Sequence, residues 1–473
     1  VGLRALGARE VTWHIPQRLR DGYGLSAEAI RSDADTGVGV VISVDCGASA
    51  QAEAELAREI GLDLIITDHH QLPEQLPHAF ALVNPQCDPL CDVFADLAGV
   101  GVGFFLLVAL RKRLRELGWF KERSEPDLRH QLDLVALGTI ADLVPLQGVN
   151  RVLVRAWLRL LEAGGRVGVR ALKQVAGVGK VNAGVVGYQL APRLNAAGRL
   201  EDAGQGVELL LEQDLLQAVT SARHLDHCNQ QRRNLEEQTF LSAERALASL
   251  DSELTHAIVL ADSGWHQGVI GIVASRLVER YHRPTVLIAL DDGRGKGSAR
   301  SISGFHLYQG LQGCAGHLQT YGGHAMAAGL SLAEDQIDDF ARSLDAQVRA
   351  QINSDDLVPC LRHDGPLLLE ELDLKILAEL TRLAPFGMGN PEPLLLVEGV
   401  RAMQIQLLQD KHLRFTACQG GYSHPAVAFG MAERREEFQG EVDLLVAPQI
   451  NSYRGRETVQ LRVKDVRPSL ECR

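Results

Sequence analysis

The stretch Leu62-Asp63-Leu64-Ile65-Ile66-Thr67-Asp68-His69-His70 decides how the first part of the chain folds. It begins with a largely apolar, β-branched run that predicts a buried strand, and it ends in Asp68, His69 and His70. In an open parallel sheet, ligands bind where the strands end. One carboxylate and two imidazoles at such an edge indicate a divalent metal site, although hydrogen-bonded polar residues are the simpler explanation of these three residues alone.

A second strand and a further acidic residue favour the metal site. Another apolar run ends at Asp45, and residues 50–60 after it have the pattern of an amphipathic helix. The resulting βαβ unit places Asp45 and Asp68 at the same edge of the sheet. Residues 132–146 form an apolar, helix-like run around Asp142, and a buried carboxylate needs a partner or a metal. Three carboxylates and two imidazoles from separate elements can surround one or two ions.

Three motifs resemble those of the DHH phosphoesterase superfamily. They are Val44-Asp45-Cys46-Gly47, Thr67-Asp68-His69-His70 and Gly138-Thr139-Ile140-Ala141-Asp142-Leu143-Val144-Pro145-Leu146. Within that superfamily the chain resembles most closely, over essentially its whole length, the RecJ family of bacterial 5′→3′ exonucleases specific for single-stranded DNA. This resemblance implies an α/β fold with a parallel-sheet first lobe, a helical connector, a smaller second α/β lobe and a C-terminal OB-like β-barrel.

The resemblance also implies a role for each residue of the group. Asp45, His69 and Asp142 would bind metal, and Asp68 would be a further ligand or would orient one. His70 would contact the scissile phosphate and either polarise it or protonate the leaving group. Two Mn²⁺ or Mg²⁺ ions would activate the attacking water and stabilise the leaving oxygen.

The family's first motif, of the form Asp-x-Asp-x-Asp-Gly, supplies further metal-binding aspartates from the first strand of the sheet. The chain starts instead at Val1-Gly2-Leu3-Arg4, without an initiator Met, and these residues resemble the end of the helix that follows the motif. We therefore expect a fragment or the product of a truncated gene, which lacks the first strand and part of the metal site. For the chain as given, the expectation is low or no nuclease activity with binding of single-stranded DNA retained.

Candidate DNA-binding residues occur in four segments. Arg18 follows a short predicted strand at 10–15 and is equally well explained as an exposed surface arginine. Residues 190–200 are interpreted as a loop of small residues with two arginines, which could bind phosphate or could be a helix cap with solvated arginines. Segments 295–301 and 322–329 combine glycines, hydroxyls, an arginine and a histidine, as suits an anion pocket. The candidates are Arg18, Arg193, Asn195, Arg199, Ser298, Arg300 and His324.

Four regions differ in their pattern of elements. We interpret residues 1–150 as the DHH phosphoesterase domain without its first strand and residues 151–255 as a helical region and connector. We interpret residues 256–350 as a DHH-associated substrate-binding domain with a Gly-Gly-His motif and residues 356–473 as an OB-like nucleic-acid-binding domain. The last region has five short strand signals, which fit a small barrel. Phe415, Phe429 and Tyr453 could stack bases there, although some of these rings must belong to the core.

Composition limits the class of protein. The net charge of −12 argues against a surface coated with basic residues for duplex DNA, but it leaves room for a local basic groove. Eight cysteines without regular spacing indicate reduced thiols in the cytoplasm. The apolar run at 100–110 is too short to span a membrane, and its glycines are better explained by close helix packing than by a nucleotide loop.

The favoured function is hydrolysis of single-stranded DNA from the 5′ end, in DNA repair and recombination. The expected partners are single-stranded DNA, a single-strand-binding protein and a helicase, and the expected state is a monomer. One alternative is a catalytically impaired scaffold that binds single strands. Another is a DHH phosphodiesterase that acts on short oligonucleotides or cyclic dinucleotides, although such small substrates need no C-terminal barrel.

Overall fold

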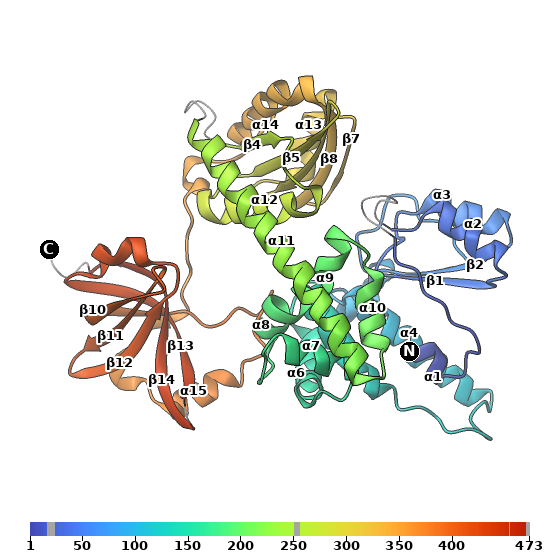
Figure 1. The fold of residues 1–473 in the computed structure, drawn as a ribbon, viewed down its shortest axis with the longest axis horizontal. Helices are drawn as coiled ribbons and strands as arrows, with labels where there is room; N and C mark the ends of the chain where they lie inside the picture. The colour runs from blue at the N-terminus through green and yellow to red at the C-terminus, as the bar shows by residue number, and fades with distance from the viewer. Residues whose placement is uncertain (17–23, 250–255, 454, 470–473) are drawn as a thin grey trace.

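The computed structural model describes residues 1–16, 24–249, 256–453 and 455–469 of the chain. Arg18, one of the candidate DNA-binding residues, lies outside these ranges. Two α/β lobes are joined by one long helix, and a β-barrel stands apart at the C-terminal end (Figure 1). No helix in the described ranges combines the length and the apolar character needed to cross a membrane.

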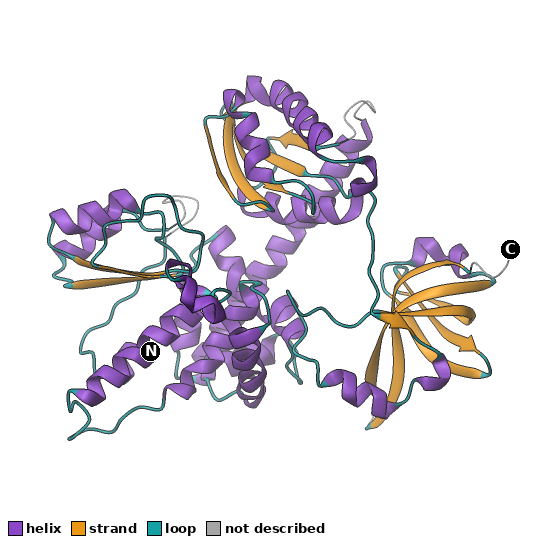
Figure 2. Ribbon diagram, turned by 180° about the vertical axis from the view of Figure 1, so that it is seen from behind, coloured by secondary structure: helices purple, strands orange, loops and turns teal. Residues whose placement is uncertain are grey.

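The first lobe is built on a three-stranded parallel sheet in the order β1-β2-β3. Helix α3 connects β1 to β2, which confirms the predicted βαβ unit. Helices α2 and α3 cover one face of the sheet and α4 the other (Figures 1 and 2). Segment 10–15, predicted as a strand, joins none of the sheets that the described residues form. The elements are α1 (Gly2–Ala5), α2 (Ala27–Asp35), β1 (Val40–Val44), α3 (Gln51–Glu59), β2 (Asp63–Thr67), β3 (Ala81–Val83), α4 (Gly99–Glu116) and α5 (Leu132–Ala141).

The middle of the chain is helical. Segment 190–200, interpreted from the sequence as a loop, is helix α9, which continues directly from a π-helical turn at Val186–Leu190. Pro192, which has no backbone N–H to donate, lies just after this turn. The predicted connector is a single helix, α11 (Leu215–Ser249), of 35 residues. It packs against α7 and α9 at one end and against α12 of the second lobe at the other. The remaining helices of this region are α6 (Gly148–Ala163), α7 (Val167–Val175), α8 (Ala183–Val185), α9 (Ala191–Leu200) and α10 (Gly204–Leu211).

The second lobe contains a five-stranded sheet in the order β4-β5-β6-β8-β7. Strands β4 and β5 are parallel, and the other pairs are antiparallel. The Gly-Gly-His motif ends β7, so His324 lies at the end of an edge strand. The elements are β4 (Ile258–Asp262), α12 (Gln267–Tyr281), β5 (Thr285–Asp291), β6 (Arg294–Arg300), α13 (Leu307–Gly313), β7 (Thr320–Gly323), β8 (Ala327–Ala333) and α14 (Ile337–Gln351).

The C-terminal strands form a closed barrel. They pair in the order β11-β12-β14-β13-β10, and β10 also pairs with β11. The barrel strands β10 to β14 are longer than the apolar runs that predicted them, at 394–397, 413–417, 426–429, 442–447 and 459–463. Antiparallel pairing continues through the polar residues at their ends, as in the hairpin of β13 and β14. The elements are β9 (Gly365–Pro366), α15 (Leu374–Thr381), β10 (Leu395–Leu408), β11 (His412–Gln419), β12 (Tyr422–Ala428), β13 (Glu441–Tyr453) and β14 (Arg456–Pro468).

The turn at residues 388–389, before the barrel, is hydrogen-bonded to the segment that follows helix α5 and Asp142. The backbone N–H of Leu146 donates to the carbonyl of Met388 at 2.7 Å, and the side chain of Gln147 donates to the carbonyl of Gly389. A Cβ at Gly389 would lie 2.9 Å from Cβ of Pro145. The barrel is therefore connected directly to the segment that follows Asp142.

Asp345 of α14 should be important for the stability of the second lobe. It is buried, and its carboxylate accepts hydrogen bonds from the backbone N–H groups of His256 and Ala257 at 2.9 and 3.0 Å. In Asp345→Ala these N–H groups lose their partner, so we expect the free energy of unfolding to fall by about 2–3 kcal/mol in chemical denaturation. The control Asp339→Ala, an exposed position on the same helix, should change it by less than about 0.5 kcal/mol. Equal losses in both variants would contradict this account.

Candidate metal centre and strand-binding pocket

His69 lies between two carboxylates at the carboxyl edge of the first sheet. Asp45 and Asp68 directly follow β1 and β2, and Asp142 directly follows α5. Nε2 of His69 is 3.0 Å from Oδ1 of Asp45 and 3.3 Å from Oδ2 of Asp142. The structure thus brings together the three side chains that were expected to share a metal centre.

Asp68 is buried and holds the neighbouring backbone in place. Its carboxylate accepts hydrogen bonds from the backbone N–H groups of Ala48, His69 and His70 at 2.8, 2.8 and 3.2 Å, and it lies 2.7 Å from Nδ1 of His70. Although burial opposes ionisation, the hydrogen bonds from His70 and the backbone lower the pKa of Asp68 to about 2. Because both carboxylate oxygens already have partners, the geometry favours Asp68 as the residue that orients His70.

The electrostatics of this group favour an added cation. Burial and the charge of Asp45 raise the pKa of Asp142 above its usual range. Burial of the His69 ring acts against its charged form, yet the hydrogen bond with Asp45 and the charges of Asp142 and Asp45 raise the pKa of His69. Carboxylate oxygens and an imidazole nitrogen are ligands that suit Mn²⁺. The donor set therefore fits a divalent metal, and Asp45, Asp68, His69 and His70 each offer a ligand atom within 4.8 Å of the others.

The position of Asp45 requires the backbone of α4 to pass close to it. It has a φ of 69°, in the left-handed region that non-glycine residues rarely adopt. Gly99, the first residue of α4, lies against it, and a Cβ there would be 2.4 Å from Oδ1 and 2.6 Å from Cα of Asp45. The glycine at this position serves close packing, as expected, and leaves room for the carboxylate.

A pocket of about 590 Å³ connects the metal centre to the helical region. Asp45 and Asp142 line it together with Asn195 and Arg199 of α9. Arg193 is not among the described residues that line the pocket. Its Nε donates to Oδ1 of Asp226 on α11 at 2.8 Å, so Arg193 ties α9 to the connector helix.

Arg199, Ser298 and Arg300 converge on the first two turns of α12. Nη1 of Arg199 donates to the carbonyl of Gly268 at 3.2 Å, and a Cβ at Gly271 would lie 2.7 Å from Oγ of Ser298 and 3.0 Å from Nη2 of Arg300. Burial lowers the pKa of Arg300, and its Nη1 donates to the neutral oxygens of Ser298 and Ala299. Together with the positive end of the α12 dipole, this arrangement favours an anion.

His70 and His324 bring the two lobes together at one site. Their rings are nearly parallel, with an interplanar angle of 14° and centroids 6.4 Å apart. The hydrogen bond from His70 to Asp68 raises the pKa of His70, although its partial burial has the opposite effect. The second lobe therefore contributes a side chain directly opposite the histidine pair of the first.

Two supporting residues were not found from the sequence. Nδ2 of Asn84 donates to the carbonyl of His70 at 2.9 Å, and Nε2 of Gln86 donates to the carbonyl of His69 at 2.7 Å. Both follow β3, a strand of three residues. If a third strand of the sheet had been predicted from the sequence, the polar residues at its carboxyl end would have been candidates as well. A strand of only three residues, however, gives a weak sequence signal.

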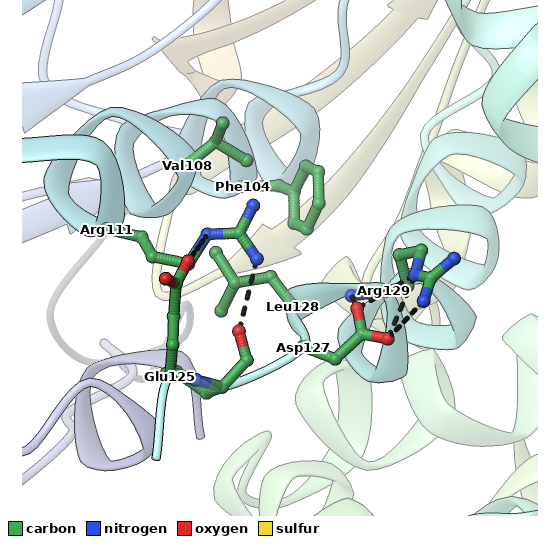
Figure 3. A pocket seen from close by; sticks show the side chains of 8 residues that line it. Phe104, Val108, Arg111, Glu125, Asp127, Leu128 and Arg129 are labelled. Atoms are coloured by element: carbon green, nitrogen blue, oxygen red, sulfur yellow. Dashed lines mark hydrogen bonds and ion pairs between the residues drawn. The ribbon is translucent and has the colours of Figure 1, made fainter. Parts of the chain in front are cut away.

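Another pocket, of about 380 Å³, lies between α4 and the segment before α5 (Figure 3). Phe104, Val108 and Leu128 form its apolar side. Its charged groups neutralise one another: Arg111 contacts Glu125 at 3.6 Å, and Arg129 contacts Asp127 at 2.7 Å. Because these charges are already paired within the protein, we assign the pocket no part in the chemistry.

Known proteins resemble the chain along its whole length. Family models described as the DHH family N-terminal domain, the DHHA1 domain and the RecJ OB domain match residues 2–139, 253–350 and 363–465. The single-stranded-DNA-specific exonuclease RecJ of Dickeya dadantii is 40% identical over 99% of this chain and 84% of its own length. The chain belongs to the RecJ family.

Two other RecJ proteins are also similar to the chain. RecJ of Bacillus subtilis is 37% identical over 96% of this chain, which spans 57% of that relative. The crystal structure of Thermus thermophilus RecJ in complex with Mn²⁺ is 31% identical, with a TM-score of 0.81, over 93% of this chain and 63% of that one. The expected fold class, two α/β lobes with an OB-like barrel, is confirmed by these matches.

The packing of Gly99 against Asp45 gives a test of the site. Gly99→Ala should displace Asp45 and weaken Mn²⁺ binding by at least about tenfold, as loss of residues that hold metal ligands in place commonly does. Mn²⁺ binding measured by electron paramagnetic resonance would check this result. Gly101→Ala is the matched control, because its Cβ would meet only the flexible end of Leu97, at 3.1 Å. Unchanged Mn²⁺ affinity in a folded Gly99→Ala protein would contradict the account.

Proposed function

We propose that the chain is a metal-dependent exonuclease that hydrolyses phosphodiester bonds of single-stranded DNA from the 5′ end, in DNA repair and recombination. The observation that carries this proposal is the convergence of His69 with Asp45 and Asp142 in a pocket that also contains Asn195 and Arg199. The named relatives, which are single-stranded-DNA-specific exonucleases, support it.

Asp45, His69 and Asp142 would hold the ions, two Mn²⁺ or Mg²⁺ in the full reaction. When bound, such ions supply a nucleophile from water and offset the charge of the scissile phosphate. His70, held by Asp68 through Nδ1, would present Nε2 to the leaving oxygen and donate a proton to it. The raised pKa of His70 supports this role, because it favours the protonated ring.

The second lobe and helix α9 would together hold the strand. Arg199, Ser298 and Arg300 near the α12 N-terminus suit one phosphate group, because the guanidinium of Arg300 donates to the neutral oxygens of Ser298 and Ala299 and can also bind an anion. Asn195, on the same face of α9 as Arg199, and His324, opposite His70, would contact the nucleotides between this phosphate and the ions.

The barrel would bind the strand beyond the pocket. Phe429 is 55% exposed and packs edge-on against His412, which suits base stacking. Phe415, the second aromatic candidate, is 3% exposed and packs against Phe438, so it belongs to the barrel core. The side chain of Tyr453, the third candidate, lies outside the described residues.

We further propose that the chain acts in the cytoplasm as a monomer, with a single-strand-binding protein and a helicase as partners. The free cysteines among the described residues support a reducing compartment. A nuclease restricted to single strands needs an activity that separates duplex DNA, which supports the helicase.

Asp142→Asn tests the catalytic assignment. We expect loss of Mn²⁺ binding and a fall of at least about a hundredfold in the Mn²⁺-dependent hydrolysis of a 5′-phosphorylated single strand, because a bound metal supplies several kcal/mol of stabilisation. Fluorescence anisotropy should show strand binding essentially unchanged. The matched control is Asp127→Asn, in the other pocket, which should behave like the wild type. A hydrolysis rate and Mn²⁺ affinity that Asp142→Asn leaves intact would refute the assignment.

The salt dependence of binding distinguishes the arginines. Arg300→Ala should weaken single-strand binding and reduce the slope of log K against log salt by about 0.7, the value for one phosphate contact. Arg193→Ala should leave that slope unchanged, because Asp226 already holds this guanidinium. Arg294→Ala, exposed at the other end of β6, is the control. An equal loss of slope in Arg193→Ala and Arg300→Ala would instead make Arg193 a DNA contact.

A further inference from the structure

A second group of metal-ligating side chains lies where α9 meets the connector helix. Glu201 directly follows α9, and His224 and Cys228 are one turn apart on α11. Each offers a donor atom, and the three atoms lie within 4.8 Å of one another. Cys228 is fully buried, whereas Glu201 and His224 are partly exposed, so a cation can reach the group from solvent.

The separations of the donor atoms match those around a tetrahedral ion. Nε2 of His224 is 3.0 Å from Oε2 of Glu201 and 3.5 Å from Sγ of Cys228. Zinc bonds of about 2.0–2.1 Å to nitrogen, about 2.0–2.2 Å to oxygen and about 2.3 Å to sulfur place tetrahedral ligands about 3.3 Å (N to O) and about 3.6 Å (S to N) apart. The two separations from His224 therefore differ from those around a bound ion by only a few tenths of an ångström.

We propose that Glu201, His224 and Cys228 form a binding site for Zn²⁺ or a similar borderline-soft divalent cation, with a fourth position open to water. A thiolate ligand selects such a cation over Mn²⁺ and Mg²⁺, which prefer oxygen. The site thus differs in chemistry from the group around His69. It does not depend on the proposed nuclease activity.

A nucleophilic role for Cys228 fits the geometry less well. Both Glu201 and Cys228 approach the same ring nitrogen of His224, whereas a histidine that activates a thiol holds the carboxylate on its other nitrogen. Burial and the charge of Glu201 raise the pKa of the Cys228 thiol to about 11, so the free thiol is a poor nucleophile. An ion placed between the three donor atoms satisfies all of them and displaces the thiol proton to solvent.

The position of the site links it to the strand-binding pocket. Glu201 also lines the pocket that contains Asn195 and Arg199, and its Oε2 accepts a hydrogen bond from Gln205 at 3.2 Å. A bound cation would offset the negative charge of Glu201 in the pocket wall. It would also tie the end of α9, two residues after Arg199, to α11.

The test uses Co²⁺ as a spectroscopic substitute for Zn²⁺ in the full chain. Thiolate ligation gives a charge-transfer absorption band, which we expect at one equivalent of Co²⁺ and which Zn²⁺ should abolish. Cys228→Ser should lose the band. His224→Gln, at an exposed position where misfolding is not a concern, should weaken Zn²⁺ affinity by at least about tenfold. Affinity should rise with pH, because the thiol must lose its proton.

Two control variants separate this site from other thiols and histidines. Cys46→Ser should keep the band, although Cys46 adjoins Asp45 in the proposed catalytic group. His227→Gln, on the same turn of α11 but outside the cluster, should keep both the band and the affinity. A band that survives Cys228→Ser, or one that disappears in Cys46→Ser, would overturn the proposal. Equal Zn²⁺ affinity in the wild type and His224→Gln would overturn it as well.

Discussion

The carboxylates of Asp45 and Asp142 both approach Nε2 of His69, and the site depends on keeping these like charges close together. Without compensation their repulsion would separate them, as the raised pKa of Asp142 indicates. Two features hold the arrangement. Asp68 binds the backbone of the His-His segment through buried hydrogen bonds, and Gly99 leaves space for Asp45 in its left-handed conformation. A cation would complete the balance of charge.

The connector helix α11 gives the second lobe its place in the site. It packs against α9 in the first half of the molecule and against α12 in the second, and its Asp226 binds Arg193. Arg199 then reaches the first turn of α12, Ser298 and Arg300 lie against the next turn, and His324 is opposite His70. The first lobe thus supplies groups suited to hydrolysis, whereas groups suited to holding phosphate come from the second lobe and from α9.

The sequence predicted what local patterns control. Two apolar runs with a segment of helical periodicity between them predicted the βαβ unit and the position of Asp45 and Asp68 at one edge of the sheet. The apolar run around Asp142 suggested that this carboxylate joins them, and the resemblance of motifs assigned it as a metal ligand. The lengths of the barrel strands were underestimated from the sequence. The strands continue into polar residues whose backbones pair with the neighbouring strand, and a search for apolar runs overlooks such residues.

The roles of the arginines could not be separated without the fold. In a loop Arg193, Asn195 and Arg199 could all face one ligand. In the helix α9, positions four apart share a face, so Asn195 and Arg199 line the pocket while Arg193 points to α11. The pairing of His70 with His324 could not be predicted from the sequence either. It depends on the relative position of the two lobes, which a helix of 35 residues determines.

The most direct test of the proposed metal centre is anomalous diffraction from crystals of the chain soaked in Mn²⁺. The account predicts an anomalous peak about 2.0–2.3 Å from Nε2 of His69, with oxygens of Asp45 and Asp142 at similar distances. A strong Mn²⁺ peak elsewhere in the molecule, with His69 still in direct contact with both carboxylates, would contradict it.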